Sequence, residues 1–217
     1  MEYLLGIDLG SSSVKAALLD IASGACAGSA FYPKEEQEIM APHPGYAEQD
    51  PDQWYKSTKD AINDAIYEAS AKPSDIKAIG IAYQMHGLVC IDENKEVLRP
   101  AIIWCDSRAV PYGKDAFEKI GKDFCLSYLM NSPGNFTASK LAWVKDHEPE
   151  IYKKIYKIML PGDWLAMKLT GEIKTTASGL SEGILWDFMK EKHSSELMSH
   201  FDFSENLLPS LTPTFGK

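Results

Sequence analysis

The first twenty residues carry the pattern that most restricts how this chain can fold. Residues 3–8 form an apolar run that ends on Asp8, and Gly10 and three serines come soon after it. Residues 13–20 then form a second, partly alternating apolar run. Two such runs on either side of a short Gly/Ser turn predict a strand, a turn and a second strand. A chain that opens in this way is expected to begin a β-sheet.

The turn of this hairpin has the chemistry of an anion-binding site. Gly10 can adopt a positive φ angle, and successive N–H groups of such a turn can form an anion-binding nest with hydroxyls beside it. The Asp8 carboxylate would repel a bare phosphate, but a bridging Mg²⁺ ion prefers oxygen ligands and would join the two. The segment lacks the Gly-Lys-Ser/Thr ending of a Walker-type loop. A magnesium–phosphate site and an ordinary hairpin turn explain these residues equally well.

The rest of the pattern predicts a mixed α/β domain. A third strand is expected at 26–33, so the chain should open with three antiparallel strands. After a polar loop over 34–49, Asp50 and Pro51 mark the start of a helix whose apolar residues keep helical spacing until Pro73. Further strands are expected at 76–83, 87–91, 97–98 and 101–104, and a loop with a strand over 176–186. Further helices are expected at 107–120, 137–147, 161–169 and 193–200.

Composition and charge narrow the class of protein. The chain has 217 residues and a net charge of −9, which argues against general binding to nucleic acids. No segment approaches the ~20 apolar residues of a membrane span, so no membrane partner is expected. The four cysteines form no C-x-x-C pair and have no histidine cluster near them, so no zinc site is expected. We expect a protein of the reducing cytoplasm.

A polar cluster, Gln84-Met85-His86-Gly87, follows one of the expected strands directly. His86 could donate a hydrogen bond to a substrate hydroxyl, and Met85 could pack against a carbon skeleton. A polar cluster that ends in glycine at the end of a strand is a plausible edge for a small ligand. The residues alone favour the simpler interpretation, a turn with a hydrogen-bonded histidine.

A second cluster, Trp104-Cys105-Asp106-Ser107-Arg108, follows the next expected strand. Asp106 is predicted to cap the following helix, with Arg108 in its first turn. A local Asp–Arg ion pair is the simpler interpretation, and exposed pairs of that kind contribute little to stability. The alternative places Asp106 or Arg108 in a substrate pocket.

Taken in order, these motifs resemble the FGGY carbohydrate kinases, and the resemblance covers nearly all of the chain. Gln84-Met85-His86-Gly87 is similar to the members of the family that phosphorylate xylulose. The other matching segments begin at Gly6, Glu48, Trp104, Phe136, His147 and Leu160. The resemblance implies an actin-like, ribonuclease H-like α/β fold and ATP-dependent phosphorylation of a ketopentose, D-xylulose to D-xylulose 5-phosphate. It also implies ATP and Mg²⁺ as cofactors.

The resemblance assigns a role to each candidate residue. Asp8 would lie beside Mg²⁺ and the transferring phosphate, as the metal ligand and the catalytic carboxylate of this chain. The sugar-binding residues would be Met85 and His86, and Asp106 and Arg108 would shape the sugar end of the cleft. The residues of the phosphate turn would be Gly10, Ser11 and Ser12, with Lys15 nearby.

Two departures from the family pattern affect these expectations. The family usually has an aspartate near Ser178, as in Ser-Asp-Ala-Ser-Gly, whereas this chain has Gly179. The family also continues beyond this length into a second domain that supplies the general base and the adenosine pocket. Residues 1–217 are therefore expected to be the N-terminal, sugar-binding domain of a longer kinase. Residues 207–217 show no regular element and look like an interrupted connection, and a frayed tail is the alternative.

Other functions stay open at this point. The kinase could act on another sugar or polyol, such as ribulose, gluconate or glycerol. The chain could also be a non-catalytic actin-like module that binds a sugar or a nucleotide. The expected partners are the sugar, ATP and the second domain, and a homodimer is possible.

Overall fold

The chain divides into two units in the computed structural model, which describes residues 1–214. The first unit contains Met1–Ile39 and Asp50–Gln84, and the second contains Met40–Gln49 and the chain from Met85 onward. Both units mix strands with helices, so the predicted α/β class is confirmed. Among residues 1–214, no helix has the length and apolar content needed to cross a membrane.

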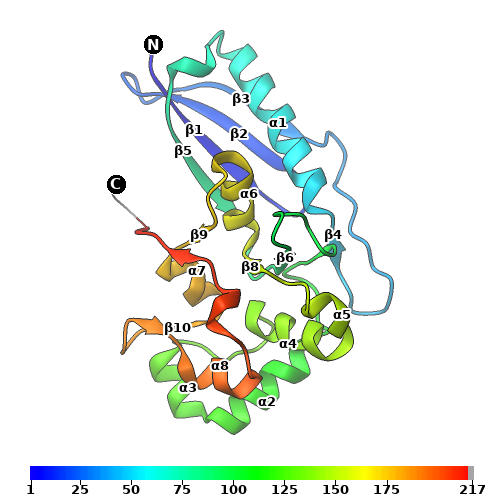
Figure 1. Ribbon diagram of the computed structural model, residues 1–217. Coiled ribbons are helices and arrows are strands. Elements are labelled where there is room, and N and C mark those ends of the chain that lie inside the picture. Colours follow the sequence, from blue (N-terminus) through cyan, green and yellow to red (C-terminus); the bar gives the residue numbers. More distant parts are fainter. Residues whose placement is uncertain (215–217) are drawn as a thin grey trace. The chain divides into compact units, whose positions relative to one another are not determined.

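A four-stranded sheet with the order β3-β2-β1-β5 forms the frame of the first unit (Figure 1). β1 pairs antiparallel with β2, β2 pairs antiparallel with β3, and β1 pairs parallel with β5. The prediction of three leading antiparallel strands is therefore confirmed. The bounds of the strands are Tyr3–Leu9 for β1, Val14–Asp20 for β2, Cys26–Tyr32 for β3 and Ile76–Tyr83 for β5.

Helix α1 (Pro51–Glu68) covers one face of this sheet and contacts β2 and β3. It begins where the sequence predicts, because the Asp50 carboxylate accepts a hydrogen bond from the Asp52 N–H and Pro51 occupies the first helical turn. Along β1 every second side chain is buried, and the intervening positions, Asp8 among them, are exposed. The alternation places Asp8 on the sheet face opposite the buried one. The 3₁₀-helix η1 (Pro73–Asp75) leads into β5.

The second unit is mainly helical, and its core surrounds α4 (Thr137–His147), whose first eight residues are buried. Its strands form short antiparallel or parallel pairs instead of one sheet. The other helices are α2 (Val110–Ile120), α3 (Lys122–Tyr128), α5 (Pro149–Tyr152), α6 (Pro161–Thr170), α7 (Ala177–Glu182), α8 (Ser195–Phe201) and the 3₁₀-helix η2 (Glu205–Leu207). The strand pairs are β4 (Glu48–Gln49) with β7 (Ala101–Ile102), β6 (Val89–Ile91) with β8 (Lys157–Met159), β9 (Lys174–Thr175) with β12 (Ser210–Leu211), and β10 (Trp186–Asp187) with β11 (Lys192–His193).

A buried cluster of ion pairs joins separate segments of the second unit. The Glu48 carboxylate lies 2.5 Å from the Arg99 guanidinium and 2.7 Å from that of Arg108. Arg99 also pairs with Glu148 at 2.7 Å, and Arg108 pairs with Asp106 at 2.7 Å. Each charge has partners, so the cluster avoids the large cost of an unpaired buried ion. It therefore fixes the segments around residues 48, 99, 106 and 148 against one another.

Three expectations about local structure are wrong. Residues 177–182 form α7 instead of a loop, because Thr176 caps the helix through the Gly179 N–H. Asp106 does not cap a helix: α2 begins at Val110, and the Asp106 carboxylate accepts hydrogen bonds from Arg108 instead. The segment 207–217 is not wholly irregular, since it contains β12; its residues 215–217 lie outside the described part of the chain.

Candidate functional site

The first group of candidate residues lies in the hairpin formed by β1, β2 and the turn between them, here called the Asp8 hairpin. Asp8 and Lys15 are direct partners across the two strands. The Lys15 ammonium lies 3.4 Å from the Asp8 carboxylate, and the two side chains are 63% and 51% exposed. A pair this long and exposed contributes little to stability, so both charges stay accessible to a ligand.

Backbone hydrogen bonds hold the turn of the Asp8 hairpin in place. The Gly10 N–H donates to the Ser13 carbonyl at 3.1 Å, and the Ser12 carbonyl accepts from the Gln37 N–H at 2.8 Å. The Leu9 carbonyl accepts from the Gln84 N–H, also at 2.8 Å. The Gly10 N–H is already bonded inside the turn. An anion at this turn would therefore be held by groups of the residues that follow Gly10 in the chain.

The residues present fit a magnesium-bound phosphate. Asp8 offers an exposed carboxylate, a common ligand for Mg²⁺ when the ion also binds substrate phosphates. Lys15 adds an exposed positive charge beside it, and the turn adds the exposed Ser12 hydroxyl. The Asp8 hairpin therefore combines an exposed carboxylate with an exposed ammonium and an exposed hydroxyl.

The second group lies in the turn at residues 85–87, here called the His86 loop. His86 has a φ angle of 60°, which is uncommon for a residue other than glycine. Its N–H donates to the Glu182 carboxylate at 2.6 Å, and the Gly87 carbonyl accepts from the Thr137 hydroxyl at 3.1 Å. The His86 ring packs edge-on against Phe136, with 4.2 Å between centroids. Met85 is 54% exposed, so its thioether is open to a ligand.

Nearby charges and burial determine the protonation of this loop. Burial lowers the pKa of His86, and the Lys140 ammonium lowers it further. Lys140 is itself fully buried, and burial lowers its pKa to about 8. A histidine with a lowered pKa is neutral at pH 7, so His86 can both donate and accept a hydrogen bond. Burial raises the pKa of Asp163 to about 6, and the neighbouring Glu182 raises it as well.

Asp106 and Arg108 are brought together, but both are buried. Asp106 is fully buried, and its carboxylate accepts from the Ala47 N–H at 2.6 Å in addition to Arg108. The Arg108 guanidinium lies over the rings of Tyr46 and Trp143, at 3.7 and 4.7 Å from their centroids. These contacts support the segment that carries Trp104, which directly precedes this cluster.

Sequence reasoning assigned no role to Trp104 or Glu182. Trp104 is 48% exposed, and its backbone carbonyl accepts a hydrogen bond from the Asn135 amide, which also donates to the Asp106 carbonyl. Its place just after a buried apolar run was a usable signal, since an exposed aromatic ring there is open to a ligand. Glu182 contacts His86 across 96 residues of sequence, and no local pattern reveals such a contact.

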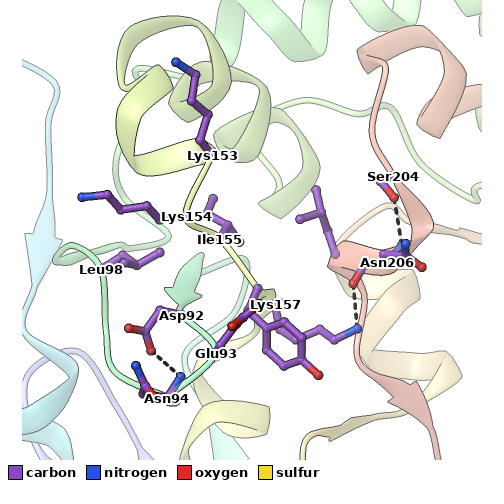
Figure 2. A pocket seen from close by; sticks show the side chains of 12 residues that line it. Asp92, Glu93, Asn94, Leu98, Lys153, Lys154, Ile155, Lys157, Ser204 and Asn206 are labelled. Carbon is purple, nitrogen blue, oxygen red and sulfur yellow. Dashed lines mark hydrogen bonds between the residues drawn. The ribbon is translucent and has the colours of Figure 1, made fainter.

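A wider hollow in the second unit contains none of the predicted residues (Figure 2). It has a volume of about 720 Å³ and is lined by polar and apolar residues of the segments 92–98, 153–157 and 204–207. The Lys157 ammonium donates to the Asn206 carbonyl at 2.6 Å, and the Asp92 carboxylate accepts from the Asn94 N–H at 2.8 Å. Because none of the predicted residues lines this hollow, it is not the candidate site.

The candidate residues therefore fall into two groups, with Asp8, Gly10, Ser11, Ser12 and Lys15 in the first unit and Met85, His86, Asp106 and Arg108 in the second. The first unit, with three antiparallel strands followed by a parallel one and a carboxylate beside the hairpin turn, has the architecture of an actin-like α/β domain. Residues 3–216 match the N-terminal domain of the FGGY family of carbohydrate kinases. The chain belongs to this family.

Individual relatives are similar over nearly the whole chain. It is 35% identical to a xylulose kinase of Bacillus subtilis (strain 168) over 213 residues, which is 97% of this chain and 42% of that protein. It is 37% identical to a xylulose kinase of Escherichia coli (strain K12) over 208 residues, which is 95% of this chain and 41% of that protein. The chain therefore spans about two fifths of the length of these relatives.

Solved structures share the fold. A xyloylose kinase from Brucella ovis superposes with a TM-score of 0.88 at 35% identity, covering 97% of this chain and 43% of that chain. A Plasmodium falciparum glycerol kinase with ADP superposes with a TM-score of 0.85 at 22% identity, covering 97% of this chain and 43% of that chain. At the lower identity the likeness concerns the fold alone.

Proposed function

We propose that this chain is the sugar-binding part of a kinase that transfers the γ-phosphate of ATP to a ketopentose, converting D-xylulose to D-xylulose 5-phosphate. The observation that carries the proposal is the exposed Asp8 carboxylate beside the hairpin turn. A carboxylate turned into the core could not meet a metal-bound phosphate. The xylulose kinases at 35% and 37% identity support the choice of sugar.

On the phosphate side, Asp8 would hold Mg²⁺, and the bound ion would neutralise part of the negative charge of the phosphates. Lys15 would stabilise negative charge on the same group. Ser11 and Ser12 would contact it from the turn, while Gly10 would let the group approach the backbone, since its own N–H is bonded within the turn. Phosphoryl transfer depends mainly on positioning and on stabilisation of charge. The fixed backbone of this turn suits that demand, because the donors need not reorganise when charge develops.

On the sugar side, Met85 and His86 would contact the ketose directly. The neutral imidazole of His86 would donate to or accept from a sugar hydroxyl, and Met85 with Trp104 would pack against carbon atoms of the sugar. Asp106 and Arg108 would shape this surface by holding the Trp104 segment, since both are buried.

We assign the general base and the adenosine pocket to a further domain, as the family resemblance implies. The base would take the proton from the attacking hydroxyl of the sugar. The related glycerol kinase structure contains ADP, which supports ATP as the phosphate donor. The four cysteines are free, which fits the proposed cytoplasmic location.

The test is a substrate panel with the full-length protein and MgATP. D-Xylulose should have a higher kcat/KM than ribulose, gluconate and glycerol, because kcat/KM measures discrimination in the transition state. A higher value for one of the other three would assign a different sugar kinase. Binding of sugar or nucleotide without any phosphoryl transfer would replace the kinase with a non-catalytic sugar- or nucleotide-binding module.

A further inference from the structure

The backbone of His86 needs support from outside its own loop. A non-glycine residue at a φ angle of 60° lies in the left-handed region, and such conformations persist only where the surroundings stabilise them. The neighbouring Gly87 lies so close to the start of α6 that a Cβ atom on it would be only 2.5 Å from the Pro161 Cγ atom. The His86 loop is therefore packed tightly against the start of α6, and its conformation depends on the contacts it receives.

The contact that reaches His86 itself comes from α7. The His86 N–H donates to the Glu182 Oε1 atom at 2.6 Å, and the same oxygen lies 3.8 Å from the ring Nδ1 atom. One carboxylate therefore holds the backbone and also faces the ring. Hydrogen bonds to an ionised acceptor are roughly twice as strong as those between neutral groups. Both side chains are mostly buried, at 27% exposure for His86 and 22% for Glu182, so solvent screens this contact little.

We propose that Glu182 is a positioning residue that fixes His86 for sugar recognition. The inference rests on the proposed function, in which His86 contacts the ketose. Glu182 holds the His86 N–H, and Phe136 packs edge-on against the ring. The Thr137 hydroxyl fixes the next carbonyl, at Gly87. With the loop preorganised, the sugar does not have to order it on binding.

Helix α7 also contains a tightly packed glycine at position 179. A Cβ atom at Gly179 would lie 2.9 Å from the Thr175 hydroxyl oxygen and 3.3 Å from the Leu160 Cδ1 atom, so any larger side chain there would require these two side chains to shift. Glu182 follows three residues later on the same helix, and residues at that spacing share a helix face.

Other charged groups face the same loop without replacing this contact. The buried Lys140 ammonium on α4 donates to the Asn135 carbonyl at 2.5 Å and acts on His86 through its charge alone. Asp163 on α6 has its pKa raised by burial and by Glu182, and its side chain bonds Thr175. Glu182 is thus the acid that binds the His86 backbone.

The experiment compares Glu182→Ala, Glu182→Gln and the control Glu118→Ala in the full-length protein. Glu118 is an exposed glutamate on α2 of the same unit. Glu182→Ala should raise the sugar KM roughly 10- to 100-fold and leave the ATP KM unchanged, the size expected for a hydrogen bond to a charged acceptor. Glu182→Gln keeps an acceptor oxygen and should recover most of this loss. Glu118→Ala should match the wild type.

Hydrogen exchange of the peptide that contains His86 gives a readout that does not require activity. In Glu182→Ala the His86 amide should exchange faster than in the wild type. In Glu182→Gln its exchange rate should stay close to that of the wild type. Unchanged exchange and sugar KM in Glu182→Ala would overturn the inference, and so would equal losses in the Ala and Gln variants. If the wild type phosphorylates none of the sugars, the proposed function fails, while the exchange data still decide whether Glu182 holds His86.

Discussion

In the Asp8 hairpin the candidate side chains project from a regular antiparallel pair of strands, whereas the His86 loop depends on contacts from several helices. Asp8 and Lys15 are more than half exposed and pair at 3.4 Å. His86 is held by Glu182 and Phe136, and Gly87 by Thr137. We therefore expect substitutions at the hairpin to change ligand binding without changing stability, and substitutions around the loop to change both.

The largest effect should follow from removing the buried acid that supports the second unit. Asp106→Ala leaves Arg108 short of one carboxylate and the Ala47 N–H without its acceptor. Breaking a buried ion pair by removing one partner costs about 3–5 kcal/mol of folding free energy. Chemical denaturation of the chain would measure this loss.

The matched control is Asp115→Ala, which removes a 47% exposed carboxylate from its pairs with Lys119 and His200. Its loss should stay below about 1 kcal/mol, as for other exposed pairs. Equal losses for the two variants would mean that the burial of Asp106 adds nothing to the contribution of its ion pair.

At the hairpin the expected outcome is the reverse: activity falls while stability is kept. Asp8→Asn removes the charge that would hold the metal-bound phosphate, so kcat/KM of the full-length protein should fall roughly 10²- to 10³-fold, the size seen when one preorganised electrostatic contact is lost. The free energy of unfolding should change by no more than about 0.5 kcal/mol, since the side chain is exposed.

Glu35→Gln, in an exposed loop of the same unit, is the control for this change and should keep full activity. Steady-state kinetics and thermal unfolding measure the two quantities separately. An Asp8→Asn enzyme with wild-type kcat/KM would remove Asp8 from the phosphate site.

The buried Lys140 ammonium near the His86 loop also makes the free energy of unfolding depend on pH. Burial lowers the pKa of Lys140 to about 8, below the 10.5 of an exposed lysine. Below pH 8 both the folded and unfolded chains carry this proton, and the full cost of the buried charge opposes folding. Between about pH 8 and 10.5 the unfolded chain binds more protons, so this cost falls as the pH rises.

Lys140→Met removes that cost and should stabilise the chain by about 2–3 kcal/mol at pH 7. The lost hydrogen bond to the Asn135 carbonyl offsets part of the gain. The advantage of the variant should shrink from pH 8 to pH 10, measured by urea unfolding at each pH. Parallel stability curves for variant and wild type would contradict a lowered pKa for Lys140.

The contrast between the Asp8 hairpin and the His86 loop also explains which parts of the molecule could be predicted from the sequence. The three leading strands and α1 follow from local signals, an alternating pattern and an Asp-Pro helix start, and the structure confirms them. Helix α7 was missed because its glycine is a poor helix former, and packing of the buried Gly179 and Leu180 outweighs that preference.

Residues that act through distant contacts left no signal in the sequence. The helix cap assigned to Asp106 is wrong because the buried arginine beside it binds the same carboxylate more strongly than a helix terminus would. The contact of Glu182 with His86 joins residues 96 positions apart. Local patterns therefore located the Asp8 hairpin well and described the surroundings of the His86 loop poorly.

The smallest effect should come from Lys15→Ala, and it tests whether the hairpin pair serves the ligand or the fold. The pair is exposed and long, so its loss should change stability by less than about 0.5 kcal/mol. If Lys15 contacts a phosphate, the KM for ATP should rise roughly two- to five-fold, the size of an exposed charge interaction. Because salt screens exposed charges, the rise should be larger at low ionic strength.

The control for this change is Lys56→Ala, on α1, which should leave the KM for ATP unchanged at every salt concentration. A rise that is independent of salt would assign Lys15 to the shape of the turn, and equal effects of Lys15→Ala and Lys56→Ala would reduce its role to the net charge of the unit.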